Sequence, residues 1–308
     1  MAERVLEAGE VGTSAGARRP RAAGLPPGFE EVRLSGDRAR TVLLRSSSKE
    51  RLLDAGVGDP EGMASGPLVA GWIEGGRTRH ALIRTGGESW VLKEYRRGGF
   101  VGRWNASRYW RRGRFFEELR VAALAGAAGV PTAEVLALIL ENAGLGSVRA
   151  WLLTRYLPGV RPLQEFFGDA IEVEMFDAAG RVVRLMHDQG IDHRDLHIGN
   201  IVGSLEGDGA RAHVIDWDRA RRRRGGSWNP SANLVRLWRS VEKGRRLGAF
   251  RAMAPRADAS TISRWSAVSA FARGYFRGRP GELAAARAYF RRRALLLGIH
   301  ALLWRRAR

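Results

Sequence analysis

The hydrophobic pattern changes its period part-way along the chain, and this change limits the possible folds more than any other feature. Within residues 69–95, short β-prone runs are separated by the glycine pairs Gly75-Gly76 and Gly86-Gly87, which predicts an antiparallel meander. After about residue 159 the apolar residues recur mainly at helical spacing. We therefore expect a sheet-rich part followed by a mainly helical part. No repeat of fixed period is present, which argues against a solenoid or a propeller.

The pattern also predicts the order of the individual elements. Strands are expected at 69–73, 80–84, 90–95, 135–140 and 151–154. Helices are expected at 114–128, 163–167, 171–187, 233–241, 261–276 and 281–304, with a strand–loop–strand insert at 192–218. The change from strands to helices follows Tyr156-Leu157-Pro158-Gly159, which we interpret as a lobe boundary.

The chain is long enough for one domain with two lobes or for two small domains, since it has 308 residues of which 44% are hydrophobic. Residues 1–28 are rich in Ala, Gly, Arg and Pro and are expected to form a disordered basic tail. Residues 29–67 are treated as an N-terminal extension, with a possible strand at 40–45. The sheet-rich N-lobe is then 68–154 and the helical C-lobe 155–308, which ends in a basic helix.

Charge and cysteine content exclude several classes of function. Lys and Arg number 52 against 32 Asp and Glu, a net charge of +20 that favours anionic partners. Without cysteine, a disulfide framework, a thiolate zinc site and a cysteine nucleophile are excluded. The N-terminus has no apolar run like that of a secretory signal, and the longest apolar stretch, 294–304, is too short to span a bilayer. We expect a protein that is soluble or lies on a membrane surface.

Two segments combine basic and apolar side chains. Residues 96–114 interleave arginines with aromatic residues, and residues 294–308 combine leucines with a terminal run of arginines. Such segments can lie on acidic lipid headgroups, hold an anionic sugar-lipid or contact nucleic acid. The alternative is that the apolar residues pack on the protein while the arginines are solvated. For the set as a whole, we favour an acidic membrane surface.

One loop carries the residues that best indicate chemistry. His193-Arg194-Asp195-Leu196 is followed by Asn200, and Asp216 lies sixteen residues after Asn200. This is the H-R-D-L-x-x-x-N pattern, typical of the catalytic loop of kinases. The first carboxylate orients the proton of an acceptor hydroxyl, while the amide and the second carboxylate hold Mg²⁺ against the phosphates of ATP. The pattern predicts Asp195 as the catalytic residue and Asn200 and Asp216 as metal ligands.

A lysine and an acidic residue complete the predicted phosphate site. Lys93 lies on the third strand of the meander, where a kinase lobe carries the lysine that binds the phosphates. The next helix carries Glu117 and Glu118, of which only one can face Lys93. Glu118, three residues after Phe115 on the apolar side, is the expected partner, and Glu117 is the alternative.

The motifs stand together in one order that resembles a known family. They are the segments 90–99, 116–120, 129–131, 153–159, 186–187, 191–201 and 215–220. Over residues 68–224, the chain resembles the lipopolysaccharide core kinases, most closely the 3-deoxy-D-manno-octulosonic acid (Kdo) kinases. The resemblance implies an α+β, protein-kinase-like fold with two lobes, an antiparallel-sheet N-lobe and a mainly helical C-lobe.

The resemblance also implies an activity. The chain would use ATP and Mg²⁺ to phosphorylate a hydroxyl of an inner-core sugar, Kdo or heptose, on an anionic sugar-lipid. It would work in the cytoplasm, peripherally on the inner face of the inner membrane. Lys93 and Glu118 would form the pair that anchors the phosphates of ATP. Arg155, Tyr156 and Leu157 would form the hinge whose backbone meets adenine.

Other functions remain open at the level of sequence. His197 stands where the Kdo kinases more often have asparagine, and the resulting His-x-Gly-Asn form is common in aminoglycoside- and choline-type phosphotransferases. Because no G-x-G-x-x-G-x-V precedes Lys93 and no D-F-G or A-P-E is present, a regulated protein kinase is disfavoured, but an atypical one stays an alternative. A different class is a non-catalytic, kinase-like binder of acidic membrane or nucleic acid. Because the five predicted site residues are intact, we favour an enzyme, and we do not expect nucleic acid as a partner.

Overall fold

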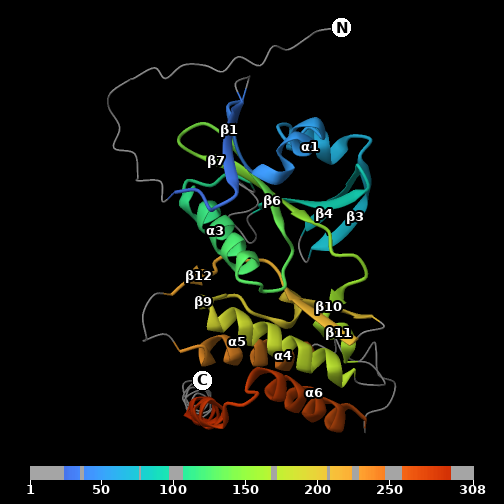
Figure 1. Cartoon of the computed structure of the whole chain (residues 1–308), viewed down its shortest axis with the longest axis vertical. Helices are drawn as coiled ribbons and strands as arrows, with labels where there is room; N and C mark the ends of the chain where they lie inside the picture. The colour runs from blue at the N-terminus through green and yellow to red at the C-terminus, as the bar shows by residue number, and fades with distance from the viewer. Residues whose placement is uncertain are drawn as a thin grey trace, which may run out of the picture.

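The computed structural model of the chain describes residues 24–34, 38–75, 78–96, 107–167, 172–206, 209–223, 229–246 and 259–292 (Figure 1). A sheet-rich part lies above a mainly helical part, as the change in hydrophobic period predicts. Most of the predicted tail, Gly76, most of the basic segment at 96–114 and the basic C-terminal segment from 293 onward lie outside the described residues. Residues 281–292 of the predicted C-terminal helix are described and are helical.

The N-lobe is built on a sheet of seven antiparallel strands, in the order β1-β2-β6-β7-β5-β4-β3. The strands are β1 (Phe29–Leu34), β2 (Arg40–Arg45), β3 (Val69–Gly75), β4 (Thr78–Thr85), β5 (Glu88–Glu94), β6 (Val135–Asn142) and β7 (Val148–Arg155). The predicted meander is present as β3, β4 and β5, paired antiparallel around the turn at Gly86-Gly87. Both glycines of that turn have positive φ, which residues with a Cβ rarely adopt.

Residues 29–67 belong to this sheet and are not a separate extension. They supply β1 and β2, the short 3₁₀ helix η1 (Ser46–Ser48), and the helices α1 (Lys49–Asp54) and α2 (Pro60–Ser65). β2 pairs with β6 over residues 40–44, so the sheet begins 39 residues earlier than the predicted start of the N-lobe at 68. The hydrophobic pattern of β1 is weak because only Phe29 of its six residues is buried. The period of the apolar residues therefore did not identify this strand.

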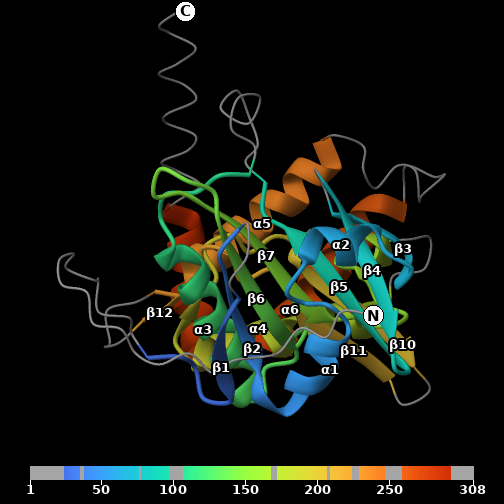
Figure 2. The same cartoon turned by 90° about the horizontal axis from the view of Figure 1, so that it is seen from above.

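Helices cover both faces of the sheet (Figure 2). On one face, α3 (Gly113–Ala127) buries Phe115 and Leu119 in a core shared with Leu43 and Leu138. On the other face, α1 and α2 contribute Leu52 and Met63 to a second core. The helix that carries Glu118 is thus packed against the sheet that carries Lys93.

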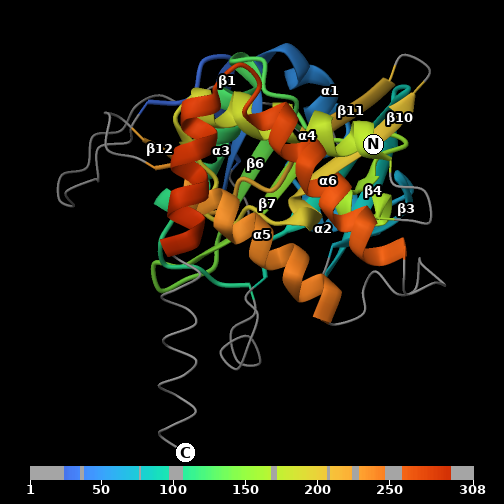
Figure 3. The ribbon, with the colours of Figure 1, turned by 90° about the horizontal axis from the view of Figure 1, so that it is seen from below.

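The C-lobe contains the helices α4 (Val173–Asp188), α5 (Ser231–Arg246) and α6 (Ala259–Tyr275), followed by helical residues 280–292 (Figure 3). Its strands are β8 (Arg161–Pro162), β9 (Ile191–Asp192), β10 (Ile201–Glu206), β11 (Gly209–Val214) and β12 (Arg221–Arg222). Two 3₁₀ helices, η3 (Leu163–Phe166) and η4 (Ile198–Asn200), lie beside them. No helix in the described part of the chain is long and apolar enough to cross a membrane.

Two glycines allow α4 and α6 to cross closely. A Cβ on Gly180 of α4 would lie 2.2 Å from the backbone oxygen of Phe271. A Cβ on Gly274 of α6 would lie 2.1 Å from the backbone oxygen of Asp177. Neither position has space for a methyl group, so each glycine permits backbone contact between the two helices.

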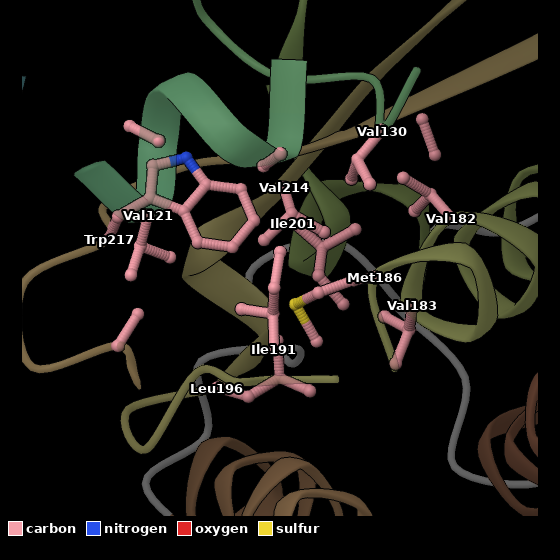
Figure 4. Close-up of a cluster of buried hydrophobic side chains, with 14 of the residues drawn as sticks. Val121, Val130, Val182, Val183, Met186, Ile191, Leu196, Ile201, Val214 and Trp217 are labelled. Atoms are coloured by element: carbon pink, nitrogen blue, oxygen red, sulfur yellow. The ribbon is translucent and has the colours of Figure 1, made fainter. Parts of the chain in front are cut away.

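A continuous core joins the two lobes behind the predicted site (Figure 4). Val121 and Val130 of the N-lobe side lie near Val214 and Trp217 of the segment that carries Asp216. The Trp217 indole donates a hydrogen bond to the Thr132 hydroxyl, 2.9 Å away. The segment on either side of Asp216 is therefore fixed to both lobes.

Candidate active site

The catalytic loop holds an unusual backbone turn just before Asp195. Arg194 has a φ of 60°, in the left-handed region, and its N–H donates to the side-chain oxygen of Asn233, 3.2 Å away. Asn233, on α5, is fully buried and donates its own amide to Asp192 at 2.9 Å. One buried amide therefore ties α5 to the residues on both sides of His193. Because left-handed backbone is costly for arginine, these bonds hold a turn that would otherwise relax.

Asp192 is held on its other side by an arginine from the segment after β12. Arg223 donates to Asp192 Oδ2 through Nη2 at 2.8 Å and Nε at 3.2 Å. Burial alone would raise the pKa of Asp192, but the hydrogen bonds from Arg223 and Asn233 outweigh it and lower that pKa. Asp192 is therefore a charged anchor for the base of the catalytic loop.

The three residues predicted to act on the phosphates and the acceptor are brought together by backbone hydrogen bonds. Ile215, just before Asp216, donates its N–H to the carbonyl of Asn200 at 2.9 Å. The Asn200 side chain donates to the carbonyl of Asp195 at 3.1 Å. These bonds place the two predicted metal ligands beside the predicted catalytic carboxylate.

His193 packs against the residues on both sides of Asp216. Its ring is completely buried, lies 5.4 Å from the Trp217 ring and contacts the Ile215 carbonyl through Nε2 at 3.1 Å. Burial lowers the pKa of His193, which favours the neutral ring. A neutral ring whose Nε2 carries the proton would donate to that carbonyl.

Lys93 contacts Asp216 rather than the predicted Glu118. The Lys93 ammonium lies 2.7 Å from Asp216 Oδ1, and no ion pair within 4.0 Å joins Lys93 to Glu118. The two carboxylates differ in ionisation. Burial opposes the charge of Asp216, but Lys93 outweighs it and lowers the pKa of Asp216, whereas burial raises the pKa of Glu118 to about 7. The contact with Lys93 is thus what keeps Asp216 acidic despite its burial.

Glu118 nevertheless lies at the same site, and the choice over Glu117 agrees with the structure. Glu118 is 1% exposed, and its charge and that of Asp216 act together to raise the pKa of Lys93 against the effect of burial. Glu117 is partly exposed and pairs with Arg120 on its own helix. The Tyr95 hydroxyl is close enough to lower the pKa of Glu118, yet neither group makes a hydrogen bond that satisfies normal geometry.

A second ion pair joins α3 to the Asp216 segment. Arg114, in the first turn of α3, donates through Nε to Asp218 Oδ1 at 2.8 Å and through Nη2 to Asp218 Oδ2. The Arg114 guanidinium also lies 5.4 Å from the centre of the Tyr109 ring. The two contacts with Arg114 give Asp218 a structural role, because they hold its carboxylate against the start of α3.

His80 is a site residue that the motifs did not indicate. The β4–β5 register pairs Ala81 with Leu92, and one further position in that register sets His80 across from Lys93, on the same face of the sheet. Burial lowers the pKa of His80, and Lys93 lowers it further. The turn at Gly86-Gly87 is a signal that could have identified this pairing, because a two-residue hairpin turn fixes the register.

The predicted hinge connects the sheet to the C-lobe. Arg155 ends β7 and donates its N–H to the carbonyl of Glu134 at 2.8 Å, and Tyr156 donates to the carbonyl of Ser89 at 2.8 Å. Within the described residues, the Leu157 N–H makes no such backbone bond. Of the three, only the Leu157 amide is therefore available to a ligand.

The donor set suits Mg²⁺ bound together with phosphates. The described residues contain no group of three His, Asp or Glu side chains able to hold a metal alone. Asn200 and Asp216 provide two oxygen-bearing side chains, and the Asn200 amide nitrogen is already used as a donor to Asp195. Mg²⁺ usually binds one or two carboxylates and completes its shell with water and substrate phosphates.

Comparison with known proteins covers the same part of the chain. The profile of the lipopolysaccharide kinase (Kdo/WaaP) family matches residues 69–267. The chain belongs to this family. The matched region includes every predicted site residue, from Lys93 to Asp216.

Curated members and a solved structure give the extent of the likeness. A 3-deoxy-D-manno-octulosonic acid kinase from Vibrio cholerae is 35% identical over 158 residues, which are 50% of this chain and 65% of that protein. One from Xanthomonas campestris is 32% identical over 208 residues, 66% of this chain and 80% of that protein. The structure of WaaP in complex with acyl carrier protein aligns with a TM-score of 0.51 at 19% identity, over 83% of this chain and 98% of WaaP. The last comparison confirms the protein-kinase-like fold.

Proposed function

We propose that this member of the Kdo/WaaP family transfers the γ-phosphate of ATP to a hydroxyl of a lipopolysaccharide inner-core sugar, Kdo or heptose. One observation carries the proposal. Asp195, Asn200 and Asp216 are connected through backbone hydrogen bonds, with Lys93 in contact with Asp216. Phosphoryl transfer needs this combination of a carboxylate for the acceptor, oxygen ligands for a metal and a cation for the phosphates.

The site residues divide this work between the two lobes. Lys93 binds the phosphates of ATP from the sheet, with Glu118 behind it, and the Leu157 amide meets adenine. Asn200 and Asp216 hold Mg²⁺, which neutralises charge on the phosphates when bound. Asp195, which is exposed, orients the acceptor hydroxyl and accepts its proton. The acceptor oxygen bonds to the γ-phosphorus as the bond from that phosphorus to the bridging oxygen breaks, and ADP leaves with that oxygen. Catalysis is then mainly the positioning of ATP and acceptor and the neutralisation of charge.

An anionic acceptor agrees with the charge of the chain. The net charge is +20, which favours an acceptor that carries carboxylates or phosphates and disfavours cationic aminoglycosides. The same charge supports a peripheral position on the acidic inner face of the inner membrane, where a sugar-lipid acceptor would lie.

A transfer assay tests the proposal. The full chain is incubated with Mg²⁺ and γ-labelled ATP, together with a Kdo-containing lipid A precursor, an aminoglycoside or a generic protein. Asp195→Asn serves as the control, because the amide is almost the size of the carboxylate but cannot accept the proton. We expect label on the Kdo lipid alone, and only with the unsubstituted chain. Label on another acceptor would retain the chemistry and reject the substrate, whereas bound ATP without any transfer would favour a non-catalytic binder.

A further inference from the structure

A leucine stands fully exposed at the tip of the β6–β7 hairpin. Leu145 is 92% exposed, and its φ of 50° lies in the left-handed region, between Gly144 and Gly146, which also have positive φ. Asparagine or glycine would adopt this backbone more easily, and a polar side chain would suit the exposure better. The fold itself therefore gives no reason for a leucine at this tip.

A tryptophan lies in the segment beside this hairpin. Trp110 is 55% exposed. Its neighbour Tyr109 exchanges two backbone hydrogen bonds of 2.8 Å with Val148, the first residue of β7. The segment that enters α3 therefore runs along the hairpin (Figure 2). Two large apolar side chains are exposed at one edge of the N-lobe.

Three arginines share this edge. Arg108, Arg111 and Arg112 are exposed and make no ion pair with any described residue. Neither 107–112 nor 143–147 contains an acidic residue. We call Leu145, Trp110 and these three arginines the docking edge.

We propose that the docking edge binds the surface of an anionic bilayer, with Leu145 and Trp110 in the interfacial layer and the arginines on lipid phosphates. Exposed tryptophan and leucine beside arginine is the combination that interfacial segments use. Each basic residue near an anionic surface strengthens binding further. The inference rests on the proposed function, because that function requires a lipid-linked acceptor.

A bilayer fits this edge better than a protein does. A stable protein interface covers roughly 800 Å² on each partner, with well-packed aromatic anchors at its centre. Here the most exposed apolar group among the described residues is a single side chain on a narrow turn, and the segment beside it carries three arginines that make no ion pair with any described residue. A soft, anionic, interfacial layer can accept such a tip without a matching pocket.

The docking edge is also directly connected to the site. Its last residue, Arg112, precedes α3, and Arg114 in the first turn of that helix binds Asp218. A bilayer at this edge would therefore lie on the side of the N-lobe from which α3 reaches the Asp216 segment. A lipid-linked sugar could enter the site from the same side.

Vesicle sedimentation tests the proposal with the full chain. Vesicles of phosphatidylcholine alone are compared with vesicles that also contain phosphatidylglycerol. We expect binding to the anionic vesicles, weakened on the order of tenfold by Leu145→Glu and by Trp110→Glu. Leu205→Glu and Trp72→Glu are matched controls, because these residues are 45% and 52% exposed on β10 and β3, away from the docking edge. Both controls should bind as the unsubstituted chain does.

Three outcomes would overturn the docking edge. The first is that the unsubstituted chain does not bind anionic vesicles. The second is that Leu145→Glu and Trp110→Glu bind these vesicles as tightly as the unsubstituted chain does. The third is that the two control variants lose as much binding as Leu145→Glu and Trp110→Glu. In the first case, an acidic protein would become the better partner. Phosphate transfer to a detergent-solubilised acceptor separates this result from the proposed function. Leu145→Glu should retain that transfer, whereas vesicle binding without any transfer would support the docking edge and reject the function.

Discussion

Arg114 and Asp218 form a two-bonded ion pair that joins the start of α3 to the segment carrying Asp216. Glu118 lies one helical turn after Arg114, and Asp216 lies two residues before Asp218. The pair therefore fixes the helix of the buried glutamate relative to the carboxylate that contacts Lys93. Arg114 also balances the charge of Asp218, whereas Asp216 is the carboxylate in contact with the Lys93 ammonium.

Arg114→Gln should lower kcat of phosphate transfer by about tenfold or more, because a small displacement of reacting groups is costly. The overall fold should remain, since both partners are partly exposed. Arg120→Gln, which removes an exposed pair with Glu117 on the same helix, is the control and should be close to the unsubstituted chain. If exchanging the two charges, Arg114→Asp with Asp218→Arg, restores part of the lost kcat, the ion pair is responsible. Equal activity in Arg114→Gln would contradict this role.

Glu118→Gln should stabilise the protein at alkaline pH. Folding raises the pKa of Glu118 from 4.5 to about 7, because burial disfavours its charge. The folded state thus holds a proton that the unfolded state loses, and stability from this group declines as pH rises from about 4.5 to 7. Gln lacks this loss, so the free energy of unfolding of the variant should exceed that of the unsubstituted chain by on the order of 2–3 kcal/mol at about pH 8.5.

Urea unfolding of both proteins at about pH 5 and about pH 8.5 measures this difference. The gain from Gln should be smaller at the lower pH, while phosphate transfer should fall at both. A gain that does not depend on pH would contradict the raised pKa of Glu118.

Gly274→Ala should destabilise the C-lobe, because its Cβ would meet the backbone oxygen of Asp177 at 2.1 Å. Overpacking of this kind costs about 1–3 kcal/mol. Gly126→Ala is the matched control, since nothing lies within 4 Å of its Cβ in α3. The control should gain about 0.5–1 kcal/mol from helix propensity. Thermal unfolding distinguishes the two, and similar shifts for both variants would argue against a close crossing of α4 and α6.

Asn233→Ala should lower both stability and activity. The substitution leaves the Arg194 N–H and the buried Asp192 carboxylate without their shared partner, at a cost of about 1–3 kcal/mol. The left-handed turn before Asp195 would then relax, and kcat should fall more than the affinity for ATP. The control is Ser240→Ala, because its hydroxyl contacts the other end of the loop at the Ile198 N–H. A variant with normal kcat would show that Asn233 does not position Asp195.

The residues predicted from the sequence are those whose type and spacing the chemistry of phosphoryl transfer limits most. Lys93, Glu118, Asp195, Asn200 and Asp216 were predicted as site residues because spacing and strand or helix context both applied to them. All five lie at one site. The contact of Lys93 with Asp216 was not predicted, because the two residues are far apart in the sequence and local pattern does not place the Asp216 segment against β5.

The local sequence pattern could not predict contacts between segments that are distant in the chain. Arg114 was interpreted only as part of a basic run, and Asn233 only as the start of a helix, because neither partner is near in sequence. β1 was missed because it buries one residue of six. The position of His80 across from Lys93 follows from the β4–β5 register, and the Gly86-Gly87 turn that sets this register is visible in the sequence.

The most direct test of the proposed activity is the transfer of phosphate to a Kdo-containing lipid A precursor by the unsubstituted chain and by Asp195→Asn, with ATP affinity measured for both. We predict that the lipid gains the mass of one phosphoryl group with the unsubstituted chain. We predict that Asp195→Asn loses this product by about a hundredfold or more, with nearly equal affinity for ATP. An Asp195→Asn variant that phosphorylates the lipid at the normal rate would contradict the assigned site, and an unmodified lipid with the unsubstituted chain would contradict the proposed activity.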